Sequence, residues 1–359
     1  MPDLDFEERL SGKRVLVTGH TGFTGSWLIG WLSRLGCRIC GLSLEPSTRP
    51  SMFVETDSVK LVDTHVIGDI TERSTAKKVF DSFDPEVVFH LAAQPIVSAA
   101  YEDPFLTFDT NVMGTLNVLE AARHSKSTVA VVCVTTDKVY ENREWVWGYR
   151  ESDPLGGTDP YSASKSACEM VVQTYQRVLA PSANNVAIAA ARGGNIIGGG
   201  DWAKDRIVPD FIRAAHAGTT LELRNPEATR PWQHVLALVH GYIWLASTLI
   251  EGEAVHRSAW NFGADLGGQK TVADLVAELL KHWPNVSTLV TQSEFKESHF
   301  LSLNSEKAHK FLGWKPGLDF ADTVAWTADW YRNYYQAGSA SQQTAKQIEN
   351  YRERIGLLA

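Results

Sequence analysis

The chain has 359 residues, of which 44% are hydrophobic and 21% charged, and this length suits two domains or one domain with a large insertion. Ordinary counts of glycine (27), proline (14) and cysteine (4) exclude low-complexity disorder, collagen-like repeats and a small disulfide-stapled fold. A net charge of −8 argues against nucleic acid or an anionic membrane binding across the whole surface, because neutralising phosphates needs clustered cations. We therefore expect a globular protein that holds any anionic ligand in a local basic pocket.

The first ten residues, MPDLDFEERL, are acidic and lack the basic start and apolar stretch of a signal peptide. The longest apolar candidate, Tyr242–Ile250, is too short to span a bilayer. From these features we expect a cytoplasmic protein with neither a membrane nor a nucleic-acid partner.

The first half of the chain alternates short, β-branched runs with longer stretches of helical periodicity. The runs are apolar almost throughout, as in strands that are buried on both faces of a sheet, and the helical stretches can form right-handed crossovers. This predicts an α/β fold with a Rossmann-type, doubly wound parallel sheet. The expected strands are Arg14–Val17, Ile39–Leu42, Thr64–Ile67, Val87–Leu91, Val129–Val134 and Val186–Ala191.

Cys37 and Cys40 form a C-x-x-C pattern beside the second expected strand. Two residues three apart in a strand face opposite sides of the sheet. No second pair of cysteines or histidines completes a metal-binding set, so we interpret both as buried thiols and expect no metal.

After residue 191 the sequence changes to loops rich in Gly, Pro and Trp, with helices expected at Val272–His282 and Phe320–Tyr331. We expect a smaller, mixed α/β substrate-binding lobe at the carboxyl ends of the strands, where ligands of such sheets bind. The predicted division is a dinucleotide-binding domain over 12–191 with part of 232–262, and a second lobe over 192–231 and 263–335. The polar tail, 336–359, is either a terminal helix or disordered.

A glycine-rich turn follows the first expected strand directly and precedes a helical stretch, Ser26–Leu35. Gly19 permits a tight turn, Gly22 lets backbone amides approach a pyrophosphate, and Gly25 allows close packing of helix and strand. The position in a βαβ series predicts dinucleotide binding rather than a purely structural turn.

The residue expected to hold the adenine ribose lies at the end of the second strand, about 20 residues further on. That position is Ser43, so the carboxylate that usually favours NAD over NADP is missing. Asp69, after the third strand, is a candidate adenine contact, although it could equally form a turn.

Tyr161 and Lys165 share one face of a helix that Asp159 and Pro160 are predicted to begin. An ammonium at this spacing can lower the pKa of a phenol from about 10 and so produce a base for an alcohol proton. The alternative is an ordinary exposed helix face.

Hydroxyl and charged side chains emerge directly from the apolar fifth strand, at Thr135, Thr136, Asp137 and Lys138. The carboxyl end of a central strand is where an α/β active site belongs. A solvated turn is the alternative, but the combination with Tyr161 and Lys165 favours a catalytic site.

Five motifs together make the chain resemble the extended short-chain dehydrogenase/reductase family over nearly its whole length. They are Thr18-Gly19-x-x-Gly22-Phe23-x-Gly25, His90-Leu91-Ala92-Ala93-Gln94, Asn111-Val112-x-Gly114-Thr115, the strand end Thr135 to Tyr140, and Tyr161-x-x-x-Lys165. Within the family the chain is similar to nucleotide-sugar 4,6-dehydratases, which have Thr-Asp followed by a second ionisable group.

Most of these dehydratases have Glu where this chain has Lys138. Lys138, together with the segment Arg230-Pro231-Trp232-Gln233-His234, resembles the branch that acts on CDP-D-glucose. The product of that branch feeds the bacterial 3,6-dideoxyhexoses of lipopolysaccharide. The resemblance thus implies a hydro-lyase that uses a nucleotide-diphosphate sugar as substrate.

The implied reaction has three steps with a retained NAD: oxidation at C4, loss of water across C5 and C6, and return of the hydride to C6. By resemblance Tyr161 with Lys165 removes the C4 hydroxyl proton, Thr135 and Thr136 bond the C4 oxygen, and Asp137 protonates the leaving C6 hydroxyl. Lys138 would remove the C5 proton as a neutral base. Alternatively it stays charged and stabilises the enolate while Asp137 or a water molecule handles the proton.

The resemblance also implies binding residues and an assembly. The implied cofactor contacts are Gly19, Gly22, Phe23, Thr24, Gly25, Ser43, Asp69, Ile70, Leu91, Ala92, Ala93, Thr135, Tyr161 and Lys165. The implied substrate contacts are Gln94, Asn195, Arg206, Ile207, Val208, Arg230, Asn261 and His299, with Arg192 in the same arm. The family implies a homodimer, or a higher assembly, joined through helices of the Rossmann lobe.

Three other functions remain open from sequence. A nucleotide-sugar epimerase shares all these motifs except the pair needed for elimination, and Asp137-Lys138 argues against it. A 4,6-dehydratase could act on a dTDP-, GDP- or UDP-sugar. A non-catalytic dinucleotide sensor would not need Tyr161 and Lys165. For single residues, packing is an alternative role for Gln94, and a surface position is one for His299.

Overall fold

The computed structural model describes residues 4–179, 185–252, 254–264, 269–291 and 300–358. Within these ranges one sheet has seven strands in the order β11-β6-β5-β4-β1-β2-β3, and every neighbouring pair is parallel. Six of the strands confirm the predicted ones, whereas the short β11 was not predicted. The strands are β1 Arg14–Thr18, β2 Arg38–Ser43, β3 Thr64–Ile67, β4 Val87–His90, β5 Ala130–Val134, β6 Ala187–Arg192 and β11 Ala259–Asn261.

The strand order reverses direction between β1 and β4. From β1 the sheet grows through β2 and β3 on one side and through β4, β5, β6 and β11 on the other. Thr18 at the end of β1 lies opposite both Leu42 of β2 and His90 of β4. Loops that leave the carboxyl ends of these strands diverge, and the crevice between them is where a doubly wound sheet binds its ligand.

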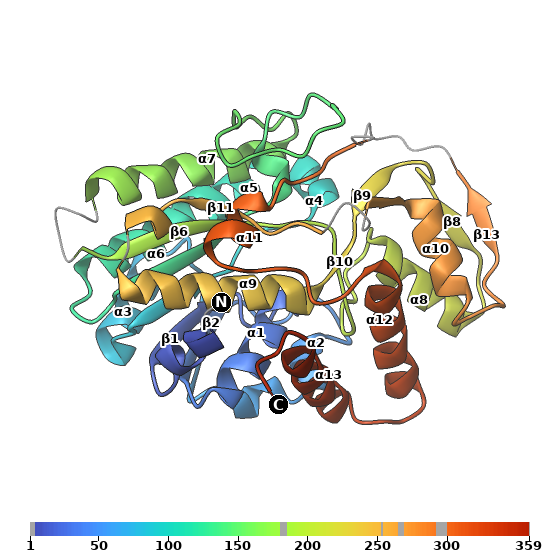
Figure 1. Cartoon of the computed structure of the whole chain (residues 1–359), viewed down its shortest axis with the longest axis horizontal. Helices are drawn as coiled ribbons and strands as arrows, with labels where there is room; N and C mark the ends of the chain where they lie inside the picture. The colour runs from blue at the N-terminus through green and yellow to red at the C-terminus, as the bar shows by residue number, and fades with distance from the viewer. Residues whose placement is uncertain (1–3, 180–184, 253, 265–268, 292–299, 359) are drawn as a thin grey trace.

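Alternate residues of the inner strands belong to two separate cores, one on each face of the sheet, whereas the edge strand β3 is largely exposed. Val15 and Val17 of β1 face the first core and Leu16 faces the second. Figure 1 shows the helices as two layers on either side of the sheet. The first core is covered by α1 Phe23–Arg34, α9 Val235–Glu251, α12 Phe320–Tyr335 and α13 Ala340–Arg354, and the second by α3 Arg73–Phe83, α6 Gly114–His124 and α7 Pro160–Thr174.

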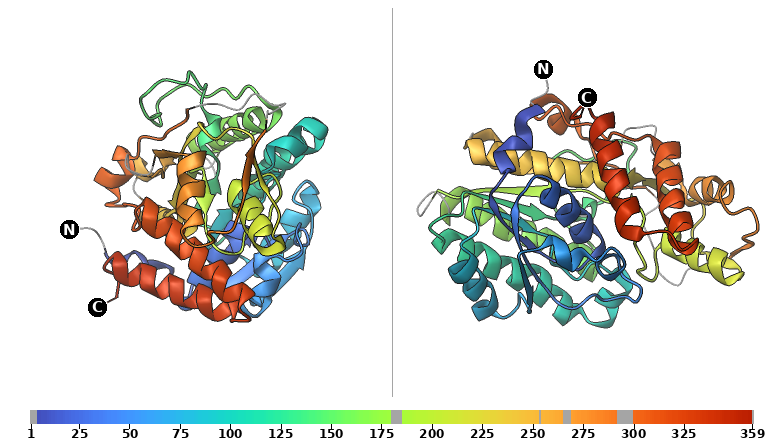
Figure 2. Two further views of the ribbon diagram at one scale, coloured as in Figure 1. Left: turned by 90° about the vertical axis from the view of Figure 1, so that its right-hand side faces the viewer. Right: turned by 90° about the horizontal axis from the view of Figure 1, so that it is seen from below.

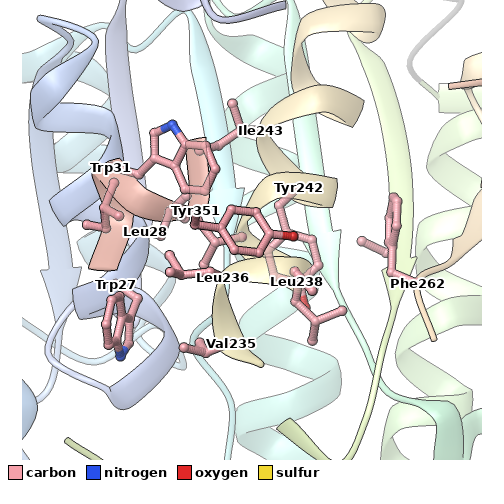
Figure 3. Packing of buried hydrophobic residues seen from close by; sticks show 14 of the residues in the cluster. Trp27, Leu28, Trp31, Val235, Leu236, Leu238, Tyr242, Ile243, Phe262 and Tyr351 are labelled. Atoms are coloured by element: carbon pink, nitrogen blue, oxygen red, sulfur yellow. The ribbon is translucent and has the colours of Figure 1, made fainter. Parts of the chain in front are cut away.

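The first core is rich in aromatic side chains, which pack between α1, α9 and α13 (Figure 3). Trp27 and Trp31 of α1 are fully buried, and the Trp27 indole donates to the carbonyl of Gly199 at 3.0 Å. Tyr351 of α13 lies edge-on to Trp31, with ring centroids 5.8 Å apart. These aromatic contacts bury large apolar areas between the helices. The sequence indicates the helices by their period but does not show which aromatic side chains meet.

The polar tail contains a helix that packs on the Rossmann part of the chain. Ile348 and Tyr351 of α13 are fully buried, and Arg352 forms an ion pair with Glu7 at 2.7 Å. Figure 2 accordingly shows the two ends of the chain close together. Of the two alternatives for the tail, the helix is the one that the structure adopts.

The smaller lobe mixes helices with short strands, as expected, and lies beyond the sheet on the right of Figure 1. Its strands pair as β8 with β13 in parallel and as β9 with β12 in antiparallel orientation. The lobe contains α8 Ile207–Ala217, β8 Leu221–Leu223, β9 Thr229–Pro231, β12 Gln269–Thr271, α10 Val272–Leu280 and β13 Thr288–Val290. Both helices predicted after residue 191, Val272–His282 and Phe320–Tyr331, are confirmed as α10 and α12.

Shorter elements connect these parts. β7 Ile196–Ile197 pairs with β10 Gln233–His234 where the two lobes meet. The others are α2 Met52–Glu55, α4 Val97–Glu102, α5 Pro104–Phe108, α11 Glu306–Phe311, the π-helical turns Asp109–Met113 and Tyr175–Leu179, and the 3₁₀ turns Leu4–Phe6, Glu8–Leu10, Ser58–Leu61, Asp137–Val139 and Ala254–His256. Among the described helices none is long and apolar enough to cross a membrane.

The C-x-x-C cysteines behave as predicted. Cys37 belongs to the first core and Cys40 to the second, so they lie on opposite sides of the sheet, and neither forms a disulfide. Burial raises the pKa of each thiol to about 12. Cys40 packs as a small apolar side chain, and the Cys37 thiol also donates to the carbonyl of Leu10 at 3.1 Å.

Candidate active site

The glycine-rich turn joins β1 to α1, with the first turn of α1 beginning at Phe23 after Gly22. Gly19 has a positive φ of 74°, and a Cβ atom there would lie 2.7 Å from the backbone nitrogen of Ala92. A Cβ on Gly25 would lie 2.2 Å from the carbonyl oxygen of Gly19. Both contacts are with backbone that cannot swing aside, so the turn requires glycine. The amides of Gly19 and Gly22 donate to the carbonyls of Leu42 and Gly19, and the amides of the first turn of α1, from Phe23, point toward a ligand at the helix start.

Ser43 ends β2 beside this turn, where the ribose-binding residue was expected. Its hydroxyl lies 2.7 Å from that of Thr21, which also donates to the carbonyl of Leu44 at 2.9 Å. Thr21 is thus a neighbour of the predicted ribose site that the sequence did not single out. The pair offers hydroxyls in place of a carboxylate, so the charge that would repel a 2′-phosphate is missing here.

Other residues predicted to contact the cofactor lie just after the ends of β3 and β4. Asp69 follows β3 and accepts from the backbone nitrogen of Thr71 at 2.8 Å, which is the turn-forming contact considered for it. Ile70 is buried under α6, with its side chain against Gly114. Leu91, Ala92 and Ala93 leave β4 next to the glycine turn, and Ala92 donates to the Thr18 hydroxyl at 3.2 Å.

Three of the sequence motifs interlock through buried hydrogen bonds. His90 lies 2.7 Å from the Thr18 hydroxyl and 2.9 Å from that of Thr115. Burial, reinforced by the charge of Lys165, lowers the pKa of His90 to about 3, so it is a neutral structural bridge. Asn111 bonds the backbone of Gln94 in both directions, at 2.8 and 3.1 Å. The motifs therefore hold the loop after β4 in a fixed shape.

Gln94 was expected to contact the sugar, but its side chain is engaged within its own loop. The amide nitrogen donates to the Thr107 hydroxyl at 2.8 Å, and the amide oxygen accepts from the backbone nitrogen of Ile96 at 2.6 Å. This arrangement matches the packing alternative. The amide keeps one further N–H and one further lone pair for a ligand.

Helix α7 begins as its sequence predicts and presents two catalytic candidates. The carboxylate of Asp159 caps the helix by accepting from the backbone nitrogen of Ser162 at 2.9 Å, and Pro160 occupies the first turn. Tyr161 and Lys165 are both buried rather than on an exposed face. The Lys165 ammonium donates to the carbonyl of Val134 at 3.1 Å, which ties the helix to the end of β5.

The end of β5 brings acid and hydroxyl groups to the Tyr161 phenol. Thr136 hydrogen-bonds to Tyr161 and donates to one carboxylate oxygen of Asp137 at 2.9 Å. The other carboxylate oxygen of Asp137 accepts from the side chain of Asn195 at 3.0 Å. Gly194 is required beside this pair, since a Cβ there would lie 2.2 Å from the carboxyl carbon of Asp137. Phenol, hydroxyl and carboxyl thus form one connected group.

Lys138 is half-buried at the same strand end, beside Asp137. Its backbone nitrogen is held by the Thr136 hydroxyl at 3.3 Å, whereas its ammonium forms no hydrogen bond or ion pair with any residue that the structure describes. An ammonium left without an internal partner is available to a substrate.

The electrostatics of Tyr161 differ from the sequence-based expectation. Burial raises the pKa of Tyr161 to about 12, and the hydrogen bond with Thr136 and the nearby charge of Arg206 offset only part of this. The sequence-based expectation was a pKa lowered by Lys165, whereas the ammonium of Lys165 donates to the Val134 carbonyl and the net shift of the Tyr161 pKa is upward. The chain by itself keeps Tyr161 as a neutral phenol, and any activation must come with bound ligands.

Three expected contacts belong to a buried network behind α7. The Thr135 hydroxyl donates to Glu169 at 2.6 Å instead of facing a substrate oxygen. Arg192 is 1% exposed and forms a two-bonded ion pair with Glu169, so it cannot reach a diphosphate. The side-chain nitrogen of Asn261 bonds the carbonyls of Tyr149 and Asn304. The sequence marked these polar positions, but only packing shows that they point inward.

The structure describes most of the residues that were predicted to contact the substrate from the smaller lobe. Arg206 precedes α8, pairs with Asp201 at 2.9 Å, and is close enough for its charge to act on Tyr161. Ile207 and Val208 open the same helix. Arg230 lies in β9, where its guanidinium donates to the carbonyl of Thr229 at 3.0 Å. His299 lies outside the described residues.

The residues at the crevice fit a dinucleotide. Each glycine of the turn lies where a Cβ would meet backbone within 3.3 Å, and this keeps backbone nitrogens within reach of a pyrophosphate at the start of α1. The hydroxyls of Thr21 and Ser43 lie at the end of β2, where the ribose of such a dinucleotide is expected.

Comparison with known proteins agrees with this geometry. The model of the family described as GDP-mannose 4,6 dehydratase matches residues 16–327. A CDP-glucose 4,6-dehydratase from Salmonella typhimurium is 41% identical over 346 residues, which cover 95% of this chain and 96% of the relative. A dTDP-glucose 4,6-dehydratase from Escherichia coli is 24% identical, covering 89% and 92%.

Two solved structures share the fold. The dTDP-glucose 4,6-dehydratase DesIV from Streptomyces venezuelae, solved with NAD and TYD bound, superposes with a TM-score of 0.75 at 24% identity, covering 90% of this chain and 98% of that one. The UDP-glucose 4-epimerase from Thermus thermophilus, solved with NAD, gives 0.77 at 24% identity, covering 89% and 99%. At these identities the superpositions show a common architecture.

Proposed function

This chain belongs to the GDP-mannose 4,6 dehydratase family, and from that premise we propose that it is an NAD-dependent hydro-lyase converting CDP-D-glucose to CDP-4-dehydro-6-deoxy-D-glucose and water. The observation that carries the proposal is the connected group Tyr161, Thr136 and Asp137, with Lys138 beside it, whose ammonium has no partner among the residues that the structure describes. An epimerase needs the phenol but no acid and base for elimination.

The chain's own groups suit the three steps in order. In the loaded enzyme Tyr161 would act as the phenolate that takes the proton of the C4 hydroxyl, and Thr136, already bonded to the phenol, orients that oxygen. The turn at Gly19, Gly22 and Gly25 would hold NAD, which would supply the hydride acceptor at C4 and the hydride donor at C6. The resulting ketone acidifies C5, whose proton Lys138 removes as a neutral base. Asp137 protonates the departing C6 hydroxyl, while Asn195 holds its second oxygen and fixes its direction.

NAD is proposed over NADP although Ser43 replaces the usual acid. The dinucleotide turn supports either cofactor, and the hydroxyl pair Thr21–Ser43 supplies acceptors for a ribose hydroxyl. The relatives that match this chain are dehydratases of one chemical class, and CDP is preferred as the nucleotide because of the 41% identical relative.

An isotope experiment tests the reaction. With CDP-glucose deuterated at C4, the label should reappear at C6 of the product, and solvent hydrogen should enter at C5. Loss of the label to solvent or to added free cofactor would contradict a retained NAD. Recovery of CDP-galactose in place of a 4-keto sugar would identify an epimerase, and turnover of dTDP-, GDP- or UDP-glucose alone would change the nucleotide.

We also propose that the protein forms a homodimer through helices of the Rossmann lobe. Exposed apolar side chains gather on α4, α5 and α7, which contact one another at the top of Figure 1. Phe105 is 84% exposed, and Leu106, Met113 and Met170 are also exposed. A second copy covering this patch would bury them in one symmetric interface.

Sedimentation equilibrium tests this assembly. The wild-type chain should sediment as a dimer or higher assembly, and Phe105→Asp combined with Leu106→Asp should reduce it to a monomer that keeps its thermal stability. A wild-type monomer at micromolar concentration would refute the proposal. The expected cytoplasmic location and the supply of dideoxyhexoses for lipopolysaccharide remain predictions.

A further inference from the structure

A buried ion pair lies behind the catalytic face of α7. Glu169 is 0% exposed and Arg192, the last residue of β6, is 1% exposed. The guanidinium donates to one carboxylate oxygen at 2.7 Å through Nε and to the other at 2.6 Å through Nη2. The remaining nitrogen, Nη1, donates to the Tyr140 hydroxyl at 2.7 Å. The protein thus supplies partners for all three guanidinium nitrogens and for both carboxylate oxygens.

Three consecutive residues at the end of β5 each bond to a different turn of α7. The carbonyl of Val134 accepts from Lys165, the Thr135 hydroxyl donates to Glu169 at 2.6 Å, and the Thr136 hydroxyl bonds to Tyr161. The middle bond ends on the ion pair. The outer two bonds involve the groups that act on the substrate.

We propose that Glu169 and Arg192 are positioning residues that fix the register between α7 and the end of β5, and so place the Tyr161 phenol against Thr136. This inference rests on the proposed dehydratase function. Arg192 extends the clamp to two further segments, since Tyr140 donates to Asn261 of β11 at 2.7 Å. Four segments that carry or flank the reacting groups are thereby held by one pair of charges.

The stability of the fold alone does not require these two charges. Removing two charges from water costs free energy, and a buried pair can often be replaced by apolar side chains with no loss of stability. What apolar packing cannot reproduce is the fixed direction of a guanidinium fork on a carboxylate that also accepts from a third residue. The pair therefore specifies geometry at the phenol.

Two variants and a control test the proposal. Arg192→Lys keeps the charge but loses the fork, and the neutral pair Glu169→Leu with Arg192→Met keeps approximate volume without leaving an unpaired charge. The control is Arg352→Lys, because Arg352 forms a similar two-bonded pair with Glu7 at 3.0 and 2.7 Å on the far side of α1. All are studied as the full chain loaded with NAD.

Two readouts separate positioning from support of the fold. The first is the ¹³Cζ resonance of Tyr161, assigned with Tyr161→Phe, which reports the hydrogen bond of the phenol without any substrate. The second is the single-turnover rate of C4 oxidation, with its deuterium isotope effect. We expect the resonance to move in both variants, the rate to fall about tenfold or more with a larger isotope effect, and KM to change little. Arg352→Lys should match the wild type.

Each result decides the proposal. If the folded neutral pair shows an unmoved resonance, or a moved resonance with the wild-type rate, the positioning role is overturned. If Arg192→Lys does not fold, the neutral pair supplies the test. If the wild-type chain oxidises no nucleotide sugar, the proposed function fails, and the resonance alone then decides whether the ion pair places Tyr161.

Discussion

Helix α7 has a reaction side and a support side, and the two treat polar groups in opposite ways. On the support side every guanidinium nitrogen of Arg192 and both carboxylate oxygens of Glu169 have protein partners. On the reaction side the Lys138 ammonium has no partner among the described residues, and the Tyr161 phenol is hydrogen-bonded to Thr136. Under the proposed function the groups with protein partners hold the geometry, and the groups with spare capacity meet the ligand.

The largest effect is expected from removing the phenol on the reaction side. Tyr161→Phe should lower turnover by a factor of roughly 10² or more, because general-base help at C4 is lost. Steady-state turnover and single-turnover oxidation measure it. Tyr175→Phe is the matched control, since Tyr175 is also buried but bonds to Glu120 away from the site. A Tyr161→Phe enzyme near the wild-type rate would assign the proton to another group.

Lys138 is the most distinctive residue of the reaction side. Lys138→Ala should reduce exchange of the C5 proton in the 4-keto intermediate by about 10² or more, while C4 oxidation in one turnover survives. Lys138→Arg separates the two roles considered for Lys138, because arginine keeps the charge but cannot act as a base. Exchange that collapses in both variants indicates a base. Exchange retained by Lys138→Arg indicates a charged stabiliser, and exchange retained by Lys138→Ala excludes either role.

The pH dependence follows from the burial of Tyr161. Burial raises the pKa of this phenol to about 12, and a raised pKa means that the proton is retained up to higher pH. Between pH 8 and 10 the cofactor-free protein should therefore show no phenolate absorbance from Tyr161, measured as the difference between wild type and Tyr161→Phe. If the phenol acts alone, the oxidation rate should rise about tenfold per pH unit below that pKa. A phenolate band already present at pH 9 would show that Lys165 activates the free enzyme.

A substitution in the glycine-rich turn should have a smaller effect than a substitution of a reacting group. Gly25→Ala places a Cβ 2.2 Å from the Gly19 carbonyl, so the turn must shift and NAD affinity should fall about tenfold, or about 1.4 kcal/mol. Calorimetric titration with NAD measures this. Gly30→Ala on the same helix is the control, since its Cβ would meet only the flexible end of Ile348 at 3.2 Å. Equal affinities in the two variants would remove Gly25 from the binding site.

The smallest effect is expected at the ribose position. Ser43→Asp should shift preference toward NAD by a few-fold, because a carboxylate accepts from a ribose hydroxyl and repels a 2′-phosphate. Titrations with NAD and NADP measure the ratio, and Ser43→Ala separates loss of the hydroxyl from gain of the charge. Much tighter binding of NADP than of NAD by the wild type would overturn the proposed cofactor.

The sequence by itself determined the elements whose residues interact locally or repeat with a clear period. The six predicted strands, the turn at Gly19, Gly22 and Gly25, and the start of α7 at Asp159 all depend on propensity, spacing and capping within a few residues. The strand end at Thr136 was also evident, because polar residues interrupt an apolar run there.

Only the tertiary structure decided which polar side chains face the crevice and which face inward. Thr135 and Thr136 are adjacent and chemically alike, yet one bonds to Glu169 and the other to Tyr161. The resemblance placed Arg192 in the substrate arm, whereas in the structure it pairs with Glu169. The two residues are 23 positions apart, so the sequence around either one does not reveal the pairing. The pKa of Tyr161 likewise depends on burial by distant segments. Such contacts are long-range properties of packing, and no local pattern in the sequence encodes their direction.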